Sequence, residues 1–147
     1  MPERTRTKRR STNAPTKGPS EIAPGVFVGG WKDALDFAGA RFCVLDEAPD
    51  DMPTATHVAI YREATDRASL PDLDRLVEGM RAAHAKGKPV LVFCGHGVRR
   101  SALGGAWYLR RAEGLSLDEA YDRVRSARPR IQHARQWVGN AADLDRA

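Results

Sequence analysis

Residues 90–101 read Val-Leu-Val-Phe-Cys-Gly-His-Gly-Val-Arg-Arg-Ser (VLVFCGHGVRRS), and this stretch decides the fold. Its first four residues form a continuous apolar run, which is typical of a strand covered on both faces. Cys94 and a short loop with two glycines follow, and the pattern of residues Ser101 to Arg111 predicts a helix. The segment is therefore expected to be a buried strand, a tight loop and a helix in succession.

The loop has the features of an anion-binding site. Gly95 and Gly97 can adopt positive φ, so that successive backbone N–H groups turn inward. The helix N-terminus adds free N–H groups and a positive dipole end, and the planar guanidinium of Arg100 can clamp two phosphate oxygens. The same field favours the thiolate of Cys94 over the thiol, which makes this residue a nucleophile. Together these groups indicate phosphoryl transfer to sulfur.

Strand and helix patterns alternate along the rest of the chain, which predicts an α/β fold in one domain. Strands are expected at residues 25–29, 42–45 and 57–61. Helices are expected at residues 31–38, along the apolar stripe from Leu70 to His84, after a capping box of Ser116 and Glu119, and from Ile131 to Leu144.

The composition bounds the class of protein. With 147 residues, 41% hydrophobic and 29% charged, the chain suits one globular domain, and no apolar run is long enough for a membrane span. Two cysteines, Cys43 and Cys94, exclude a disulfide-stapled scaffold and fit a reducing compartment, so we expect a cytoplasmic protein. The four histidines have no ligand spacing with the cysteines, and no structural zinc site or other cofactor is expected.

The net charge of +5 lies in residues 1–20, which hold six Lys and Arg and one acid. The remaining residues 21–147 hold 18 basic and 18 acidic residues, and this neutrality argues against a nucleic-acid surface on the body. Residues 1–20 have no apolar periodicity and are interpreted as a disordered basic tail. Two roles remain open for it: a solvated tail that aids solubility, or an arm that binds polyanions weakly.

Cys94, five residues, then Arg100 and Ser101 resemble the signature loop of the protein-tyrosine-phosphatase superfamily. Residues 21–30 (EIAPGVFVGG) are similar to the opening strand and double glycine of its compact dual-specificity branch, and residues 115–120 (LSLDEA) with Arg128-Pro129 to its closing helices. The resemblance covers nearly all of residues 21–147. It implies the single-domain cysteine-phosphatase fold, with a short central sheet of about four or five mostly parallel strands flanked by helices. The implied phosphate-binding loop is Gly95, His96, Gly97, Val98, Arg99 and Arg100.

The resemblance implies a two-step reaction without metal. Cys94 attacks phosphorus while an acid protonates the leaving oxygen, and water then hydrolyses the phosphocysteine. Arg100 and the loop amides hold the phosphoryl oxygens, and Ser101 matches the family hydroxyl that bonds the sulfur and helps it leave.

The family acid lies on a loop roughly thirty residues before the cysteine. Asp66, 28 residues upstream of Cys94, matches this position best. Asp72 and Asp74 are nearer, but they fall in the first turn of the next helix, where acids commonly serve as caps.

Two positions depart from the family pattern. Phe93 stands where the family usually has His, which bears on the rate more than on the type of reaction. The Cys-x-His-Gly-x-x-Arg spacing also resembles the RNA 5′-triphosphatases of mRNA capping, although those usually have Asn where Arg99 stands. Arg99 either lies at the rim of the site and favours multiply phosphorylated substrates, or faces solvent.

The sequence is thus interpreted as a metal-independent cysteine phosphatase that hydrolyses phosphomonoesters, with phosphotyrosine first and phosphoserine or phosphothreonine as further candidates. The expected partner is a phosphorylated protein or another phosphomonoester. The alternatives are an RNA 5′-triphosphatase-like or phosphoinositide phosphatase on the same fold, and an inactive phosphate-binding module. Cys43 is interpreted as a core residue, the alternative being a resolving thiol for oxidised Cys94.

Overall fold

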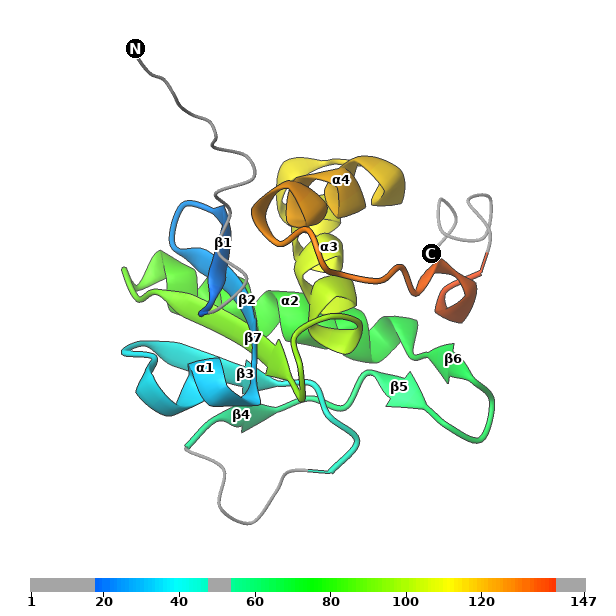
Figure 1. Ribbon diagram of the computed structural model, residues 1–147, viewed down its shortest axis with the longest axis horizontal. Coiled ribbons are helices and arrows are strands. Elements are labelled where there is room, and N and C mark those ends of the chain that lie inside the picture. Colours follow the sequence, from blue (N-terminus) through cyan, green and yellow to red (C-terminus); the bar gives the residue numbers. More distant parts are fainter. Residues whose placement is uncertain (1–17, 48–53, 140–147) are drawn as a thin grey trace.

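Strand β7 (Val90–Cys94) is the centre of the structure, a computed structural model that describes residues 18–47 and 54–139 (Figure 1). All five of its side chains are buried, as the apolar run predicts. Val90, Val92 and Cys94 belong to the larger apolar cluster, whereas Leu91 and Phe93 belong to a smaller one. The alternation shows that both faces of the strand are covered.

Four further strands complete a sheet of order β1-β2-β7-β3-β4: β1 (Ser20–Ala23), β2 (Val26–Gly30), β3 (Ala40–Cys43) and β4 (Thr56–His57). Strands β2, β7, β3 and β4 run parallel to one another, and only β1 pairs antiparallel, with β2. The prediction of a short, mostly parallel central sheet is confirmed. The opening segment of residues 21–30 was not predicted to form two strands, and Gly25, with φ of 77°, makes the tight turn between β1 and β2.

The helices lie on both sides of this sheet (Figure 1). The short α1 (Trp31–Asp36) covers the smaller apolar cluster. The larger cluster lies under α2 (Leu70–Ala85), α3 (Arg100–Glu113) and α4 (Leu117–Ala127). The capping box of Ser116 and Glu119 is present at the start of α4, as predicted. Among the described residues, no helix has the length and apolarity that crossing a membrane requires.

The prediction of one strand over residues 57–61 is wrong. Strand β4 ends at His57, and the chain leaves the sheet while burying Val58 and Ile60 in the core. Strand β5 (Tyr61–Arg62) then pairs with β6 (Arg67–Ala68) in a separate two-stranded sheet. The apolar alternation over residues 57–61 therefore reflects which side chains are buried. The backbone at the two ends of this stretch pairs in two different sheets.

The prediction of a helix from Ile131 to Leu144 is also wrong. Only a short 3₁₀ helix, η2 (Arg135–Trp137), forms, and residues 140–147 lie outside the described part. The N–H of Gln132 donates to Val98 O, and the N–H of Ala134 donates to the Tyr121 hydroxyl. These two N–H groups therefore bond to other segments and form no helical hydrogen bonds. Burial raises the pKa of Tyr121 to about 12, which keeps its hydroxyl protonated in this contact.

The predicted basic tail covers residues 1–20, and the structure describes only its last three residues, 18–20. Residues 1–17 lie outside the described part, but Ser20 is buried and pairs with Val28 as the first residue of β1. The ordered body therefore begins before residue 21.

Gly105 in α3 supplies a test of the packing between helix and sheet. A Cβ there would lie 2.5 Å from Val28 Cγ2 and 3.0 Å from Ile22 Cδ1. We expect Gly105→Val to lower the free energy of unfolding by about 1–3 kcal/mol through overpacking. The melting temperature should fall by about 2–8 °C. Ala82→Val, which introduces the same β-branched side chain at an exposed helical position, is the control. Equal melting temperatures for the two variants would contradict this packing.

Candidate active site

The loop between β7 and α3 is folded as a tight turn against the sheet edge. Gly97 takes φ of 72°, whereas Gly95 keeps a negative φ, so only one of the two glycines is used for its left-handed conformation. A Cβ on Gly97 would lie 2.6 Å from the carbonyl carbon of Gly29. The close approach of the loop to the end of β2 therefore requires glycine at this position.

Four consecutive carbonyl groups of this loop face away from its centre, and each accepts a hydrogen bond. The donors are Trp31 N to Gly95 O (3.0 Å), Arg128 Nη2 to His96 O (3.5 Å), Arg128 Nε to Gly97 O (2.7 Å) and Gln132 N to Val98 O (2.7 Å). A loop whose carbonyls point outward leaves its N–H groups to line the inside, which is the arrangement of an anion-binding nest.

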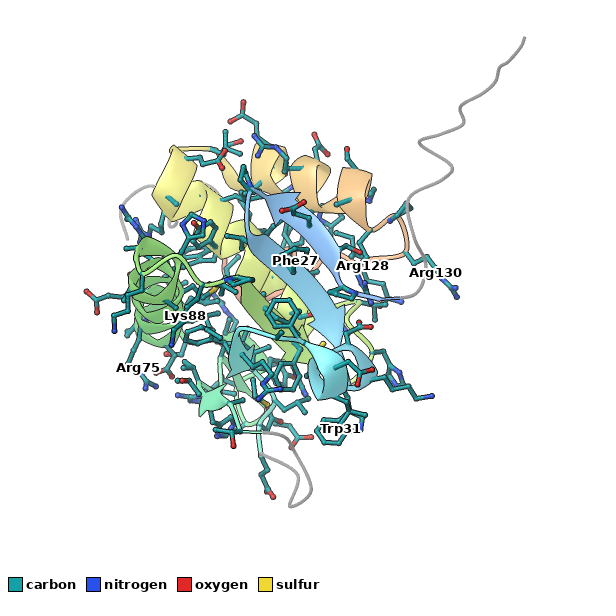
Figure 2. All side chains as sticks on the ribbon, turned by 90° about the vertical axis from the view of Figure 1, so that its left-hand side faces the viewer. Phe27, Trp31, Arg75, Lys88, Arg128 and Arg130 are labelled. Carbon is teal, nitrogen blue, oxygen red and sulfur yellow. The ribbon has the colours of Figure 1, made fainter. Side chains whose placement is uncertain are left out.

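Arg128 supplies two of these four bonds and is 8% exposed. Figure 2 shows its side chain beside the blue strand β1. Its Nη1 also donates to Gly18 O (2.8 Å) and to Ser20 Oγ (3.0 Å). Asp33 Oδ2 lies 3.7 Å from its Nη2 and accepts a hydrogen bond from Gly30 N. One buried guanidinium thus ties the loop to the residues around the start of β1 and to α1. The sequence shows Arg128 as part of the family-like Arg128-Pro129 motif, but its role in the site was not predicted.

Cys94 and Ser101 come together because the strand, loop and helix fold back on each other. Cys94 ends β7, Ser101 lies in the first turn of α3, and their Sγ and Oγ atoms are 3.3 Å apart, both buried. If the thiol ionises, the serine hydroxyl donates the hydrogen bond of this pair and the sulfur accepts it.

Arg100 lies at the mouth of the loop, half-buried. Its Nη2 is 3.5 Å from Asp46 Oδ2, and its guanidinium carbon is 5.0 Å from the centre of the Tyr61 ring. A planar guanidinium held over a ring in this way keeps a fixed orientation.

A pocket of about 350 Å³ opens over Cys94. Six of the expected loop and catalytic residues line it, together with four residues from other segments: Cys94, Gly95, His96, Val98, Arg99 and Arg100, with Leu45, Tyr61, Glu63 and Trp137. The rings of Tyr61 and Trp137 contact each other, with centroids 4.3 Å apart, and form one wall. These four residues were not predicted as part of the site. The spacing of the family acid also fits Glu63, which lies 31 residues before Cys94, although only aspartates were predicted for that role.

Asp66 is not among the residues that line this pocket. It lies with Glu63 in the four-residue turn of the β5–β6 hairpin, and its φ of 53° is left-handed. Its Oδ1 accepts a hydrogen bond of 2.6 Å from the Tyr61 hydroxyl, and this bond raises the pKa of Tyr61. Asp66 therefore contacts the pocket wall, whereas Glu63 is part of the pocket itself.

Asp72 and Asp74 have partners away from the pocket. The carboxylate of Asp72 is paired with Arg62 and Arg75; although partial burial acts in the opposite direction, hydrogen bonds from Arg75 and Ser69 lower its pKa. Asp74 accepts hydrogen bonds from Trp107 Nε1 (2.8 Å) and Arg111 Nε (2.9 Å). These contacts agree with a structural role for both acids.

Cys43 lies on the other face of the sheet from Cys94. It pairs in register with Phe93, and directly opposed residues of neighbouring strands project to the same side. Both belong to the smaller apolar cluster, whereas Cys94 belongs to the larger one, and burial raises the pKa of the Cys43 thiol. The geometry favours a core role for Cys43 over that of a resolving thiol. Within the described residues, no group of His, Cys, Asp and Glu side chains could hold a metal ion.

The contacts of Arg128 predict that it holds the carbonyl groups of the loop in their outward orientation. We expect Arg128→Met to weaken the inhibition of aryl phosphate hydrolysis by vanadate at least tenfold. Two loop carbonyls lose their donors in this variant and are free to turn inward. Ser20→Ala, which removes one contact of the same guanidinium and leaves its loop bonds in place, is the control and should change inhibition less than threefold. Vanadate inhibition that is the same in both variants would contradict the assignment.

Comparison with known proteins gives a consistent result. The model of the family described as "Dual specificity phosphatase, catalytic domain" matches residues 47–142. Human dual specificity phosphatase 28 is 36% identical over 131 residues, which cover 82% of this chain and 74% of that protein. Human dual specificity protein phosphatase 16 is 29% identical over 140 residues, covering 88% of this chain but 21% of that protein.

Solved structures agree with the sequence relatives. A crystal structure of a human DUSP28 variant superposes with a TM-score of 0.72 at 27% identity, covering 88% of this chain and 93% of that one. A mouse putative dual specificity phosphatase, complexed with zinc tungstate, gives a TM-score of 0.70 at 29% identity, covering 91% and 87%. The predicted resemblance and fold are thereby confirmed, and the chain belongs to the dual specificity phosphatase family, a family of protein-tyrosine and dual-specificity phosphatases.

Proposed function

We propose that this protein hydrolyses phosphomonoesters, with phosphotyrosine as the first substrate and phosphoserine or phosphothreonine as further ones, through a phosphocysteine intermediate. The observation that carries the proposal is the position of Cys94 in a pocket formed by a loop whose carbonyls all point away from it. Such a pocket stabilises both an anionic sulfur and a phosphoryl group. The mouse relative supports the proposal, because it is a complex with tungstate, a tetrahedral oxyanion.

In the first proposed step, the Cys94 thiolate attacks phosphorus in line with the leaving oxygen. The S–P bond forms, the bond from phosphorus to the leaving oxygen breaks, and this oxygen takes a proton from a carboxylic acid of the protein. The loop N–H groups and Arg100 hold the three equatorial oxygens. The 3.5 Å contact between Arg100 and Asp46 gives way to the phosphoryl oxygens in this step.

In the second proposed step, water attacks phosphorus and the S–P bond breaks. The carboxylate formed in the first step takes the proton of the water, and inorganic phosphate leaves. Ser101 Oγ, at 3.3 Å from Cys94 Sγ, donates a hydrogen bond to the departing thiolate. This bond strengthens as negative charge develops on sulfur, so it lowers the barrier to hydrolysis of the phosphocysteine.

Glu63 is the proton donor that the geometry favours over Asp66. Glu63 lines the pocket together with Cys94 and Arg100, whereas the Asp66 carboxylate is turned to the Tyr61 hydroxyl. Both belong to one hairpin turn, and a glutamate side chain reaches one methylene further than an aspartate. Asp66 then has a positioning role: it holds Tyr61, whose ring faces the guanidinium of Arg100.

The same acid separates the proposed reaction from its alternatives. A phosphomonoester needs its leaving oxygen protonated, whereas a phosphoanhydride such as an RNA 5′-triphosphate needs this far less. A carboxyl group in the pocket therefore supports the monoester. Family membership does not favour the triphosphatase, phosphoinositide or inactive-module alternatives.

The proposed site of action is the cytoplasm, because the mechanism needs Cys94 as a free thiolate and this compartment keeps thiols reduced. Polyanion binding by the basic segment before residue 18 stays a proposal; its signature would be an affinity that falls steeply with salt.

The nucleophile and the clamp supply the first test. Cys94→Ser should lower turnover of an aryl phosphate by more than about 10³-fold, because the hydroxyl stays protonated, while vanadate still binds. Arg100→Lys should also be severe, because a point charge cannot replace the bidentate fork. Cys43→Ala is the matched control: it alters a buried cysteine on the other face of the sheet and should keep most activity. A fully active Cys94→Ser enzyme would end the phosphocysteine mechanism.

The proton donor is tested by leaving-group dependence. Glu63→Gln should lower kcat on a phosphoserine peptide by about 10²–10⁴-fold and cost much less on an activated aryl phosphate. Asp66→Asn, whose amide oxygen can still accept from Tyr61, should show a smaller loss without this dependence. If the leaving-group dependence follows Asp66→Asn instead, the donor is Asp66 and the assignment of Glu63 is wrong.

A further inference from the structure

Arg99 lies in the same pocket as Arg100 but is held by different contacts. Its guanidinium carbon lies 4.5 Å from the centre of the Trp137 ring, and that ring is 4% exposed. A guanidinium over a buried indole has a fixed platform and loses little freedom when it binds a ligand. Its Nε is buried, and no described residue accepts a hydrogen bond from it.

Among the described residues, Arg99 has no carboxylate partner, unlike Arg100 and Arg128. Arg100 is paired with Asp46 and Arg128 with Asp33. No carboxylate of the described residues lies within 4.0 Å of the Arg99 guanidinium. Glu63 lines the same pocket, but no ion pair joins it to Arg99. Within the described part of the chain, the rim on the Trp137 side therefore carries the unpaired charge of Arg99.

We propose that Arg99 is a specificity residue that binds a second acidic group of the substrate, next to the phosphate that is removed. This inference rests on the proposed function, since it assumes that phosphate occupies the loop. The pocket of about 350 Å³ is lined by both arginines, and they are consecutive residues at the start of α3. A phosphoryl group held by Arg100 therefore brings the neighbouring part of the substrate to Arg99.

The chemistry of the second group is that of an oxyanion, either a carboxylate or a second phosphate. Both fit the planar fork of a guanidinium, which forms paired charge-assisted hydrogen bonds with them. Arg99 is half-buried, so the interaction is screened less than at an open surface. A gain of about tenfold in kcat/KM is the size expected for one such contact.

The test uses three phosphotyrosine peptides that differ only in the residue beside the phosphotyrosine: alanine, glutamate or phosphoserine. Loss of the tyrosine phosphate is followed by mass spectrometry at low salt. We expect the wild-type protein to prefer the two acidic peptides over the alanine peptide about tenfold in kcat/KM. Comparing glutamate with phosphoserine identifies which oxyanion the rim favours.

The variants assign the preference to Arg99. Arg99→Gln should reduce the ratio of acidic to neutral peptide to about one, whatever happens to the absolute rates, and Arg99→Lys should keep part of it. Arg130→Gln removes one positive charge at an exposed position outside the pocket and should keep the wild-type ratio. A loss of preference in Arg130→Gln equal to that in Arg99→Gln would overturn the inference, because the preference would then reflect net charge.

Two failures remain distinguishable. If the wild-type protein hydrolyses all three peptides with equal kcat/KM, the inference about Arg99 is overturned and the proposed function stands. If it hydrolyses none of them and no aryl phosphate, the proposed function itself is overturned.

Discussion

The structure depends on one electrostatic requirement: the carbonyl groups of residues 95–98 must point away from the space where an anion binds. An outward carbonyl buried without a donor would be costly, so the fold supplies one for each. The start of α1, the end of α4 and the segment before η2 each send an N–H group to the loop. Elements far apart in sequence are thus arranged around the outside of one five-residue turn.

Glycine at two places makes this arrangement geometrically feasible. Gly97 has a left-handed φ and no room for a Cβ against Gly29. A Cβ on Gly30 would lie 3.0 Å from Gly95 O. The double glycine at the end of β2 and the glycine in the loop are therefore parts of one contact, which explains why the sequence carries them together.

The strand-loop-helix segment could be predicted from sequence because its signals are local. A continuous apolar run, two glycines and an arginine at the helix start each have one dominant interpretation. The pocket wall could not be predicted in the same way. Tyr61 and Glu63 come from strand β5 and the turn of its hairpin, and Trp137 comes from a 3₁₀ helix. Tertiary contacts set the positions of these elements. Phe93 shows the intermediate case: strand alternation places it with Cys43 and Leu91, on the opposite side from the pocket. It can therefore act on the loop only through packing.

The bonds of Arg128 have a consequence for the order in which the protein becomes competent. They join residues that are 108 and 110 positions apart in the chain, and a third bond from the same side chain spans 31 positions to reach the loop. Contacts between residues so far apart form slowly, because the entropy of closing the loop is lost before the contact stabilises the fold. During synthesis from the N-terminus, residues 90–101 leave the ribosome well before residue 128, so the nascent chain carries a cysteine and an arginine without the loop that makes them reactive. The loop around Cys94 therefore gains its bonds to Arg128 only after residues 1–128 have been synthesised.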